Sequence, residues 1–269
     1  MWTQDVFHKF RFTFLDCPTN TKKEFEENCK QLTSSEINST MLATFGTSAG
    51  AFFSKLEVDT MLNKDKHNFF PTVITQPLFI FFDFAKSQDR TVRTTGVPIF
   101  KDGQIVGVDV LEILEYPEKT DYDDIIEGDL QELIKEYGAE NFAAIGFDVT
   151  GVGKGLEDWM KKIEDFGVSI IPVEFSLKNK SAIYTLFKLL VEKTVRGEKL
   201  ISIPYTENTE DQLRKLRFKR AKGNSRGNLM VHHEKESDRD DIPDSLAGLC
   251  SLVIQPDSAP QIVTGKLSG

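Results

Sequence analysis

The sequence predicts an α/β fold on a mixed sheet, in which a three-stranded antiparallel meander is extended by parallel strands and helices cover both faces. Residues 76–85 form a nearly unbroken apolar run, which is typical of a central strand buried on both faces. Two strand-like runs follow, joined at Lys101-Asp102-Gly103, which is a hairpin signal. Helical and strand-like segments then alternate, as in parallel strands connected by right-handed helical crossovers.

The first 70 residues are expected to form an N-terminal extension, because they show no apolar core of their own. A polar stretch at 63–68 is typical of a linker. The local signals are a short strand at 10–14, helices at 21–32 and 56–62, and a helix start at Ser34 and Ser35. We therefore expect three parts: the extension (1–70), a main domain (71–256) and a flexible tail (257–269).

In the main domain, apolar runs and helical periodicity alternate. After the run at 76–85, strands are expected at 91–100, 104–115, 142–149, 168–175 and 200–203. Helices are expected at 121–137, 155–166, 178–195, 207–218 and 242–254. Pro243 in the first turn of the last helix, with acids around its start, supports that assignment.

Composition indicates an ordinary globular protein: 269 residues, 39% hydrophobic and 28% charged. Three widely spaced cysteines argue against a disulfide framework and for a reducing compartment, and no histidine lies near them at the spacing of a zinc site. No apolar run approaches the length of a membrane span, and the N-terminus lacks a signal-peptide cleavage pattern, so no membrane association is expected.

The net charge of −9 would ordinarily count against nucleic-acid binding, but the cations are unevenly placed. Residues 213–233 contain no acid, and their cations are Arg214, Lys215, Arg217, Lys219, Arg220, Lys222 and Arg226. A solvated loop would also account for such a run. Its position just before an acidic pair favours a clamp on the phosphate backbone.

The candidate chemistry lies in carboxylates at element ends. Asp83 ends the first buried strand and Asp148 ends the fourth, so parallel neighbouring strands would bring them to one sheet edge. Asp240 or Asp241, at the start of the last helix, would add a third carboxylate. Such a cluster needs a cation, and oxygen-only ligands suit Mg²⁺ or Mn²⁺, with room for two ions. Taken singly, each acid is also explained as a cap or a turn residue.

Residues 151–155 (Gly-Val-Gly-Lys-Gly) are similar to a phosphate-binding loop but fail its pattern at Asp148 and Gly155. ATP binding is therefore not expected, and a tight strand-to-helix turn is preferred. Lys154 remains a candidate contact for a DNA phosphate.

Three separated motifs resemble one known family: Phe82-Asp-Phe-Ala…Asp89-Arg-Thr-Val, then Gly146-Phe-Asp-Val-Thr-Gly-Val-Gly-Lys-Gly-Leu, then Asp240-Asp-Ile-Pro-Asp-Ser-Leu-Ala. They are similar, in the same order, to the nuclease domain of the large terminase subunit of viruses, and the resemblance covers roughly residues 75–254. It implies the RNase H-like fold. Residues 43–62 also resemble the stretch that closes the terminase ATPase region, so that 1–70 would be the ATPase–nuclease connecting region.

The resemblance implies a metal-dependent endonuclease that cuts concatemeric double-stranded DNA, with little sequence preference, during DNA packaging. It implies Asp83, Asp148 and the pair Asp240/Asp241 as catalytic metal ligands, with Asp241 as the first choice of the pair. Asp89, Asp244 and Lys180 would support them. The second acid is Asp where some relatives have Glu, which would alter the metal spacing.

The expected partners are double-stranded DNA, a terminase ATPase domain, the small terminase subunit and the portal, in the host-cell cytoplasm at the procapsid. No ATPase motor is recognised, so the chain would be an excised domain or one part of a split machine. Two alternatives stay open: a Holliday-junction resolvase or RNA–DNA hybrid nuclease of the same fold, and a non-catalytic module that binds DNA or a partner.

Overall fold

The computed structural model describes residues 12–30, 32, 37, 41–42, 50–84, 90–150, 162–165, 167–220, 229–233 and 239–254. The chain divides into two compact units, Met1–Ser48 and Ala49–Gly269. Among the described helices, none combines the length and apolar content that a bilayer crossing requires.

The described residues of the first unit include a short 3₁₀-helix, η2 (Phe14–Asp16), and the α-helix α1 (Lys22–Cys29). Helix α1 confirms the helix predicted at 21–32, and Thr21 caps it by accepting a hydrogen bond from the backbone of Glu24. Phe14 begins η2 and is not in the strand predicted at 10–14, because the Asp16 carboxylate accepts hydrogen bonds from Thr13 and favours a turn. Residues 10 and 11 of that predicted strand lie outside the described residues. The predicted helix start at Ser34 and Ser35 lies outside the described residues.

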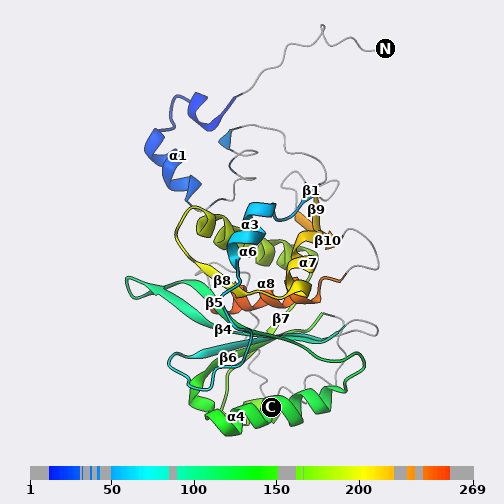
Figure 1. The fold of residues 1–269 in the computed structure, drawn as a ribbon. Coiled ribbons are helices and arrows are strands. Elements are labelled where there is room, and N and C mark those ends of the chain that lie inside the picture. Colours follow the sequence, from blue (N-terminus) through cyan, green and yellow to red (C-terminus); the bar gives the residue numbers. More distant parts are fainter. Residues whose placement is uncertain are drawn as a thin grey trace, which may run out of the picture. The chain divides into compact units, whose positions relative to one another are not determined.

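The second unit is organised on a seven-stranded mixed sheet with the order β2-β8-β5-β4-β3-β6-β7 (Figure 1). Its strands are β2 (Leu62–Asn63), β3 (Leu78–Asp83), β4 (Val92–Lys101), β5 (Gln104–Glu115), β6 (Phe142–Asp148), β7 (Ile170–Val173) and β8 (Ile201–Pro204). Strands β3, β4 and β5 form the predicted antiparallel meander, and β6, β7 and β8 join it by parallel pairing. Asp102 and Gly103 make the predicted hairpin turn with positive φ angles of 53° and 77°.

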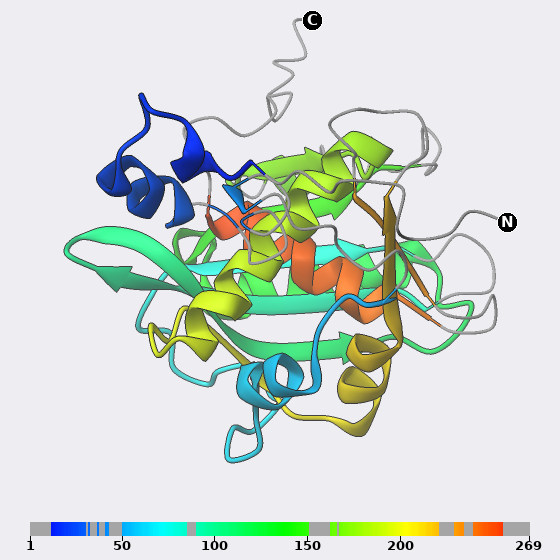
Figure 2. The ribbon, with the colours of Figure 1, turned by 90° about the horizontal axis from the view of Figure 1, so that it is seen from above.

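Helices cover both faces of the sheet, as the sequence predicts (Figure 1). One face carries α3 (Lys55–Met61), α6 (Leu177–Val195), α7 (Glu207–Lys215) and α8 (Asp241–Val253), and the other carries η4 (Asp124–Leu130), a π-helical segment, followed by α4 (Gln131–Tyr137). Alternation along β3 divides the core: Phe81 packs on the α6/α8 side, and Leu78, Ile80 and Phe82 pack on the η4/α4 side. Figure 2 shows α8 lying across the sheet, where it contacts β3, β4, β5 and β6.

The predicted helix at 207–218 ends early. Helix α7 stops at Lys215, and the chain continues as β9 (Leu216–Arg220), which pairs with β10 (Leu229–His233) and β1 (Gly50–Ala51) in a separate three-stranded antiparallel sheet. The reason is the alternation of Leu216 and Phe218, which places both side chains against the core while Arg217 lies between them. The predicted flexible tip at 223–227 lies outside the described residues.

The boundary between the units differs from the one near residue 70 that the sequence indicates. The second unit reaches back to Ala49, because Phe52, Phe53, Val58 and Met61 are buried in its core. Helix α3 confirms the helix predicted at 56–62. Most of the predicted helix at 155–166 and the whole predicted tail at 257–269 lie outside the described residues.

Candidate active site

Asp83 and Asp148 end two strands that are parallel neighbours. In the register of β3 and β6, Phe82 is opposite Phe147, so Asp83 and Asp148 come next at the same edge of the sheet. Phe81 and Ala144 pack in the α6/α8 core, and the two-residue period places Asp83 and Asp148 on that same face. The juxtaposition expected from the sequence is therefore present.

Asp148 is held at the end of β6 by local backbone. Its carboxylate Oδ1 accepts a hydrogen bond from the backbone N–H of Thr150 at 2.7 Å, and the side chain is 6% exposed. The hydroxyl of Thr150 accepts the backbone N–H of Phe175 at 2.6 Å, which ties the end of β6 to the segment after β7. Asp148 is thus positioned by two strand ends at once.

The first turn of α8 delivers three more acids to the same edge. Asp240 precedes the helix, Asp241 begins it and Asp244 lies one turn along. The side chain of Asp241 is 7% exposed, and its Oδ2 lies 3.4 Å from the backbone nitrogen of Arg90. Asp244 accepts hydrogen bonds from Tyr184 and, at 2.7 Å, from Lys180 Nζ, both of α6. Lys180 Nζ is also 3.5 Å from Asp240 Oδ2.

Close packing fixes α8 over the strand that carries Asp83. The buried hydroxyl of Ser245 donates to the carbonyl of Phe81 at 3.2 Å and lies 3.0 Å from the hydroxyl of Thr94. One turn later, a Cβ added at Gly248 would lie 2.3 Å from the Phe81 ring. A small hydroxyl residue and a glycine therefore let the helix approach the sheet closely enough to bring its acids to Asp83.

The cluster has the electrostatics of carboxylates crowded away from water. Burial raises the pKa of Asp83 well above its usual range, and the negative charges of Asp244, Asp148 and Asp241 raise it further. Burial also raises the pKa of Asp244 to about 6, although the charge of Lys180 opposes the rise. Burial acts to lower the pKa of Lys180, but Asp244 and Asp240 outweigh it and hold the ammonium charged.

The donor set fits a hard divalent cation. It consists of carboxylate oxygens, which Mg²⁺ and Mn²⁺ prefer. Burial and, after it, the charges of neighbouring carboxylates raise the pKa of Asp83, and a bound cation would offset both effects. Within the described residues, no three His, Cys, Asp or Glu side chains stand in a metal-binding arrangement. Asp240 and Asp244 are instead directed to the ammonium group of Lys180.

The predicted basic residues are only partly described. Arg214 forms ion pairs with Glu210 and Asp59, and Lys215 pairs with Asp211 at 2.7 Å, so both lie in surface networks of α7. Arg217 donates to the backbone carbonyls of Arg214 and Leu216. Lys219 and Arg220 belong to β9, whereas Asp89, Lys154, Lys222 and Arg226 lie outside the described residues.

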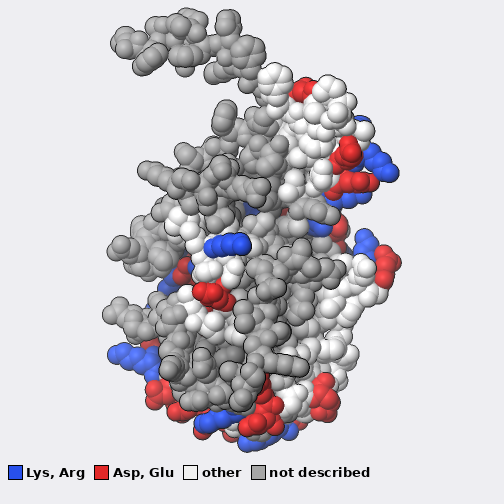
Figure 3. All heavy atoms as spheres, turned by 180° about the vertical axis from the view of Figure 1, so that it is seen from behind, with Lys and Arg blue, Asp and Glu red and all other residues white. Residues whose placement is uncertain are grey.

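The exposed acidic residues at the start of η4 belong to the other face of the sheet, opposite the α6/α8 face that carries Asp83 and Asp148. Asp123, Asp124 and Glu127 are exposed on the outer face of the η4/α4 helix. On the side seen in Figure 3, Lys and Arg are interspersed with Asp and Glu at the lower end, where α4 lies. Glu127 pairs with Lys162, and all three acids are exposed to solvent.

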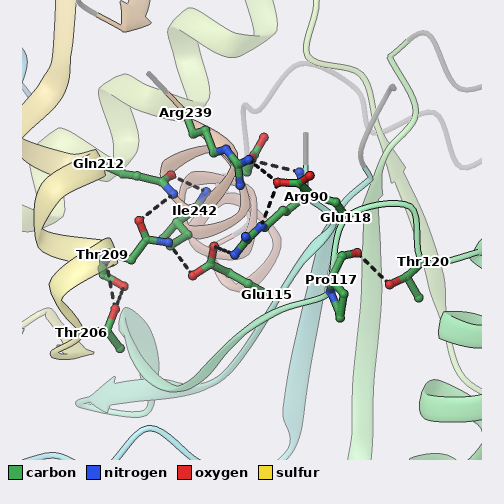
Figure 4. A network of polar contacts seen from close by, with 12 residues as sticks. Arg90, Glu115, Pro117, Glu118, Thr120, Thr206, Thr209, Gln212, Arg239 and Ile242 are labelled. Carbon is green, nitrogen blue, oxygen red and sulfur yellow. Dashed lines mark hydrogen bonds and ion pairs between the residues drawn. The ribbon is translucent and has the colours of Figure 1, made fainter. Parts of the chain in front are cut away.

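A polar network around the start of α8 was not predicted (Figure 4). Glu118 is 3.7 Å from Arg90 Nε and 2.7 Å from Arg239 NH2, and Arg90 NH1 is 3.9 Å from Glu115. Gln212 of α7 accepts the backbone N–H of Ile242 at 3.1 Å. The only signal in the sequence was the nearness of Arg90 to Asp89 and of Arg239 to Asp240, because the remaining partners come from distant elements.

Comparison with solved structures gives three similar folds. The large terminase nuclease from the thermophilic phage G20c is 22% identical with a TM-score of 0.54, and the match covers 74% of this chain and 96% of that one. The large terminase of a second thermophilic bacteriophage is 14% identical with a TM-score of 0.59, covering 90% and 54%. The HK97 bacteriophage large terminase is 11% identical with a TM-score of 0.52, covering 86% and 50%.

The chain has the fold of a large terminase nuclease domain. The predicted RNase H-like mixed sheet is thereby confirmed. The chain spans about half the length of the latter two large terminases, those of the second thermophilic phage and of HK97. A scan against protein-family models finds no match, and a search of curated proteins finds none either.

Proposed function

We propose that this chain is a divalent-metal-dependent nuclease of the terminase type that hydrolyses phosphodiester bonds in double-stranded DNA. One observation carries the proposal: Asp83 and Asp148, at the ends of parallel neighbours, meet the acids of the first turn of α8 on one face of the sheet. Acids brought together in this way repel one another, and Lys180 balances only part of their charge, so the arrangement favours a bound cation. The terminase-nuclease fold supports the same function.

Each side chain has a role that follows from its contacts. Asp83 and Asp148 stand on rigid strand ends, and together with Asp241 and Asp240 they are our candidates to hold two Mg²⁺ or Mn²⁺ ions. When bound, such ions would activate the attacking water and stabilise the leaving oxygen. Asp244 is committed to Lys180 and Tyr184, so its role is to hold Lys180 in place.

The DNA itself would be held by cations outside this cluster. The basic residues of α7 and β9, from Arg214 to Arg220, with Lys222 and Arg226, are our candidates for phosphate contacts. Lys154 is a further candidate. Such contacts place the backbone without reading the bases, which agrees with cutting of little sequence preference. Because they displace counterions, DNA affinity is expected to fall steeply as salt is added.

The biological setting is also a proposal. The substrate would be concatemeric viral DNA in the host-cell cytoplasm, cut at the procapsid during packaging. The large terminases of HK97 and of the second thermophilic phage are about twice as long as the part that this chain matches. We therefore propose that the chain acts with a terminase ATPase domain, a small terminase subunit and a portal.

Plasmid cleavage in Mg²⁺ or Mn²⁺ tests the activity. The wild type is expected to nick and linearise the plasmid, and Asp83→Asn and Asp148→Asn are expected to reduce the rate at least 100-fold. Asp102→Asn is the matched control: the same substitution at an exposed hairpin turn whose positive φ angle suits asparagine. Undiminished cutting by the Asp148 variant would refute the site.

The choice of substrate separates this function from its rivals. Linear duplex is expected to outcompete a four-way junction and an RNA–DNA hybrid, and the reverse order would favour a resolvase or a hybrid nuclease. Calorimetry with Mn²⁺ addresses the non-catalytic alternative. A protein that binds DNA but no metal would be a binding module in which Lys180 has permanently replaced the ion.

A further inference from the structure

The first turn of α8 is capped in an unusual way. Asp240 occupies the N-cap position, where an aspartate carboxylate ordinarily accepts the backbone N–H of the second or third helical residue. The third residue here is Pro243, which has no N–H. The first bond within the helix runs from the Asp244 N–H to the Asp240 carbonyl at 2.8 Å. Ile242, the second residue, therefore supplies the only N–H that a normal cap would use.

That N–H is taken by a side chain from another helix. The amide oxygen of Gln212, in α7, accepts it at 3.1 Å, and Gln212 is 3% exposed (Figure 4). Asp240 makes no side-chain cap bond, and its φ and ψ of −128° and 10° differ from the extended backbone usual for a cap. Its carboxylate instead lies 3.5 Å from Lys180 Nζ, inside the acid cluster.

Gln212 is itself oriented by a chain of polar contacts. Its amide nitrogen lies 3.5 Å from Asn208 Oδ1, one turn earlier in α7, and Asn208 donates to Glu115 at the end of β5 at 2.6 Å. Glu115 pairs with Arg90, whose backbone nitrogen lies 3.4 Å from Asp241 Oδ2. This series of contacts therefore starts at the backbone of Ile242, in the first turn of α8, and ends at the carboxylate of Asp241 in the same turn.

We propose that Gln212 is a positioning residue of this site: by capping α8 in place of Asp240, it keeps the Asp240 carboxylate available to a divalent cation. The proposal rests on the proposed function, which it deepens. Pro243 acts in the same direction, since it removes the other N–H that would compete for that carboxylate.

If the buried side chain of Gln212 only stabilised the fold, its replacement would not change the affinity of the site for a cation. Gln212→Met keeps the length and volume of the side chain but removes the acceptor. The Ile242 N–H then has the Asp240 carboxylate as its nearest acceptor in sequence, and Asp240 turns away from the cation site to cap the helix. The fold is retained, and the metal site loses one carboxylate.

The test is a double-mutant cycle read by Mn²⁺ calorimetry on the whole chain. Gln212→Met is expected to weaken Mn²⁺ binding about tenfold or more, as removal of an orienting partner of a metal ligand commonly does. Asp240→Asn weakens binding by itself. In the Asp240→Asn background, Gln212→Met is expected to add less than a twofold loss, because no carboxylate remains to be drawn away.

Leu213→Val is the control for general damage to α7. Leu213 is fully buried beside Gln212, so this change lowers the melting temperature and is expected to leave Mn²⁺ affinity within twofold. The proposal is overturned if Gln212→Met leaves Mn²⁺ affinity unchanged, or weakens it equally in both backgrounds. A wild type that binds no Mn²⁺ overturns it as well.

Plasmid cleavage by the same four proteins separates this result from the proposed function. A wild type that binds Mn²⁺ but leaves plasmid intact refutes the nuclease activity, while a coupled cycle in calorimetry still supports the role of Gln212. Active cleavage with an additive cycle refutes the role of Gln212 and leaves the nuclease proposal standing.

Discussion

The carboxylate of Asp83 ends a strand whose other residues are almost all buried. Burial, together with the charges of Asp244, Asp148 and Asp241, raises its pKa well above the usual range. The folded state therefore holds a proton on Asp83 more tightly than the unfolded chain does. In the absence of metal, the ionised carboxylate opposes folding.

The effect of the Asp83 carboxyl group on the stability of the fold changes with pH in a predictable direction. Below about pH 4 the carboxyl group is protonated in both states, and above it the unfolded chain ionises first. The free energy of unfolding of the wild type in EDTA is thus expected to fall as pH rises towards the raised folded-state pKa, by at most about 1.4 kcal/mol per pH unit for one carboxyl group. Asp83→Asn removes that term, so it should melt higher than the wild type at pH 8 in EDTA while losing cleavage.

Melting temperatures measured from pH 4 to pH 8, with EDTA and with Mn²⁺, test this predicted dependence of stability on pH and metal. Mn²⁺ is expected to raise the melting temperature of the wild type and of Asp102→Asn, and to have little effect on Asp83→Asn. An Asp83→Asn variant that melts lower than the wild type in EDTA would contradict the assignment of Asp83 to a repulsive cluster.

At the residue scale, the sequence predicted the acids but not their partners. Asp83, Asp148, Asp240 and Asp241 were identifiable because each stands at the end of an element whose periodicity is clear. The contacts of Lys180 and Tyr184 with Asp244, and of Gln212 with Ile242, join residues about 30 to 60 positions apart. Such contacts depend on how helices pack, and no local pattern specifies them.

The site depends on how closely helix α8 packs against strand β3. Ser245 bonds to the backbone of β3, and Gly248 lies against the Phe81 ring so closely that an added Cβ would overlap it at 2.3 Å. Gly146 of β6 contacts the same ring from the sheet, at 2.7 Å for an added Cβ. Two glycines and one phenylalanine therefore set the distance between helix and sheet.

Gly248→Ala is expected to lift α8 from the sheet. The substitution should lower the free energy of unfolding by about 1–3 kcal/mol, as overpacking of a core does, and should reduce cleavage because Asp240 and Asp241 move with the helix. Urea unfolding and plasmid cleavage measure the two effects. Gly128→Ala, in η4 with no atom near its added Cβ, is the matched control and should be neutral or slightly stabilising. Equal stability of the two variants would show that the helix is not so tightly seated.

The sequence predicted the helices and strands whose apolar residues follow one clear helical or strand spacing. It did not predict an element whose apolar spacing suits both a helix and a strand. The meander and the strands β6 and β7 follow from apolar runs and turn signals. Strand β9 was missed because Leu213, Leu216 and Phe218 also suit a continuation of α7, and only pairing with β1 and β10 decides between the two. Pairing with a two-residue strand from another part of the chain leaves almost no trace in the sequence.

At the scale of the molecule, the second unit includes residues that the sequence assigned to the extension. Phe52 and Phe53 pack against α6, and Lys188 of α6 bonds both carboxylate oxygens of Glu57 at 2.7 Å and the carbonyl of Phe52 at 2.9 Å. No local pattern indicated this, because short apolar pieces separated by polar stretches cannot be assigned to a core without the partner surface.

Truncation tests this boundary. A chain beginning at Ala49 is expected to unfold cooperatively near the wild-type melting temperature. A chain beginning at Pro71 loses the buried side chains of Phe52, Phe53, Val58 and Met61, worth about 1.5–3 kcal/mol each, and leaves Lys188 without its carboxylate. That loss approaches the whole stability of a typical domain, so this chain should be unfolded or aggregated by circular dichroism and light scattering. A stable shorter chain would restore the boundary near residue 70.

If a divalent cation binds at this site, as we propose, it must compete with the ammonium group of Lys180. This ammonium group is tethered between Asp240 and Asp244 and cannot diffuse away, so part of the negative charge is balanced before any ion arrives. An incoming ion that uses Asp240 must compete with this counter-ion, and the free energy of that competition is subtracted from its affinity. On the proposed function, Lys180 partly offsets the repulsion among the acids before metal binds, and we expect cleavage only where free metal is abundant enough to compete with the lysine.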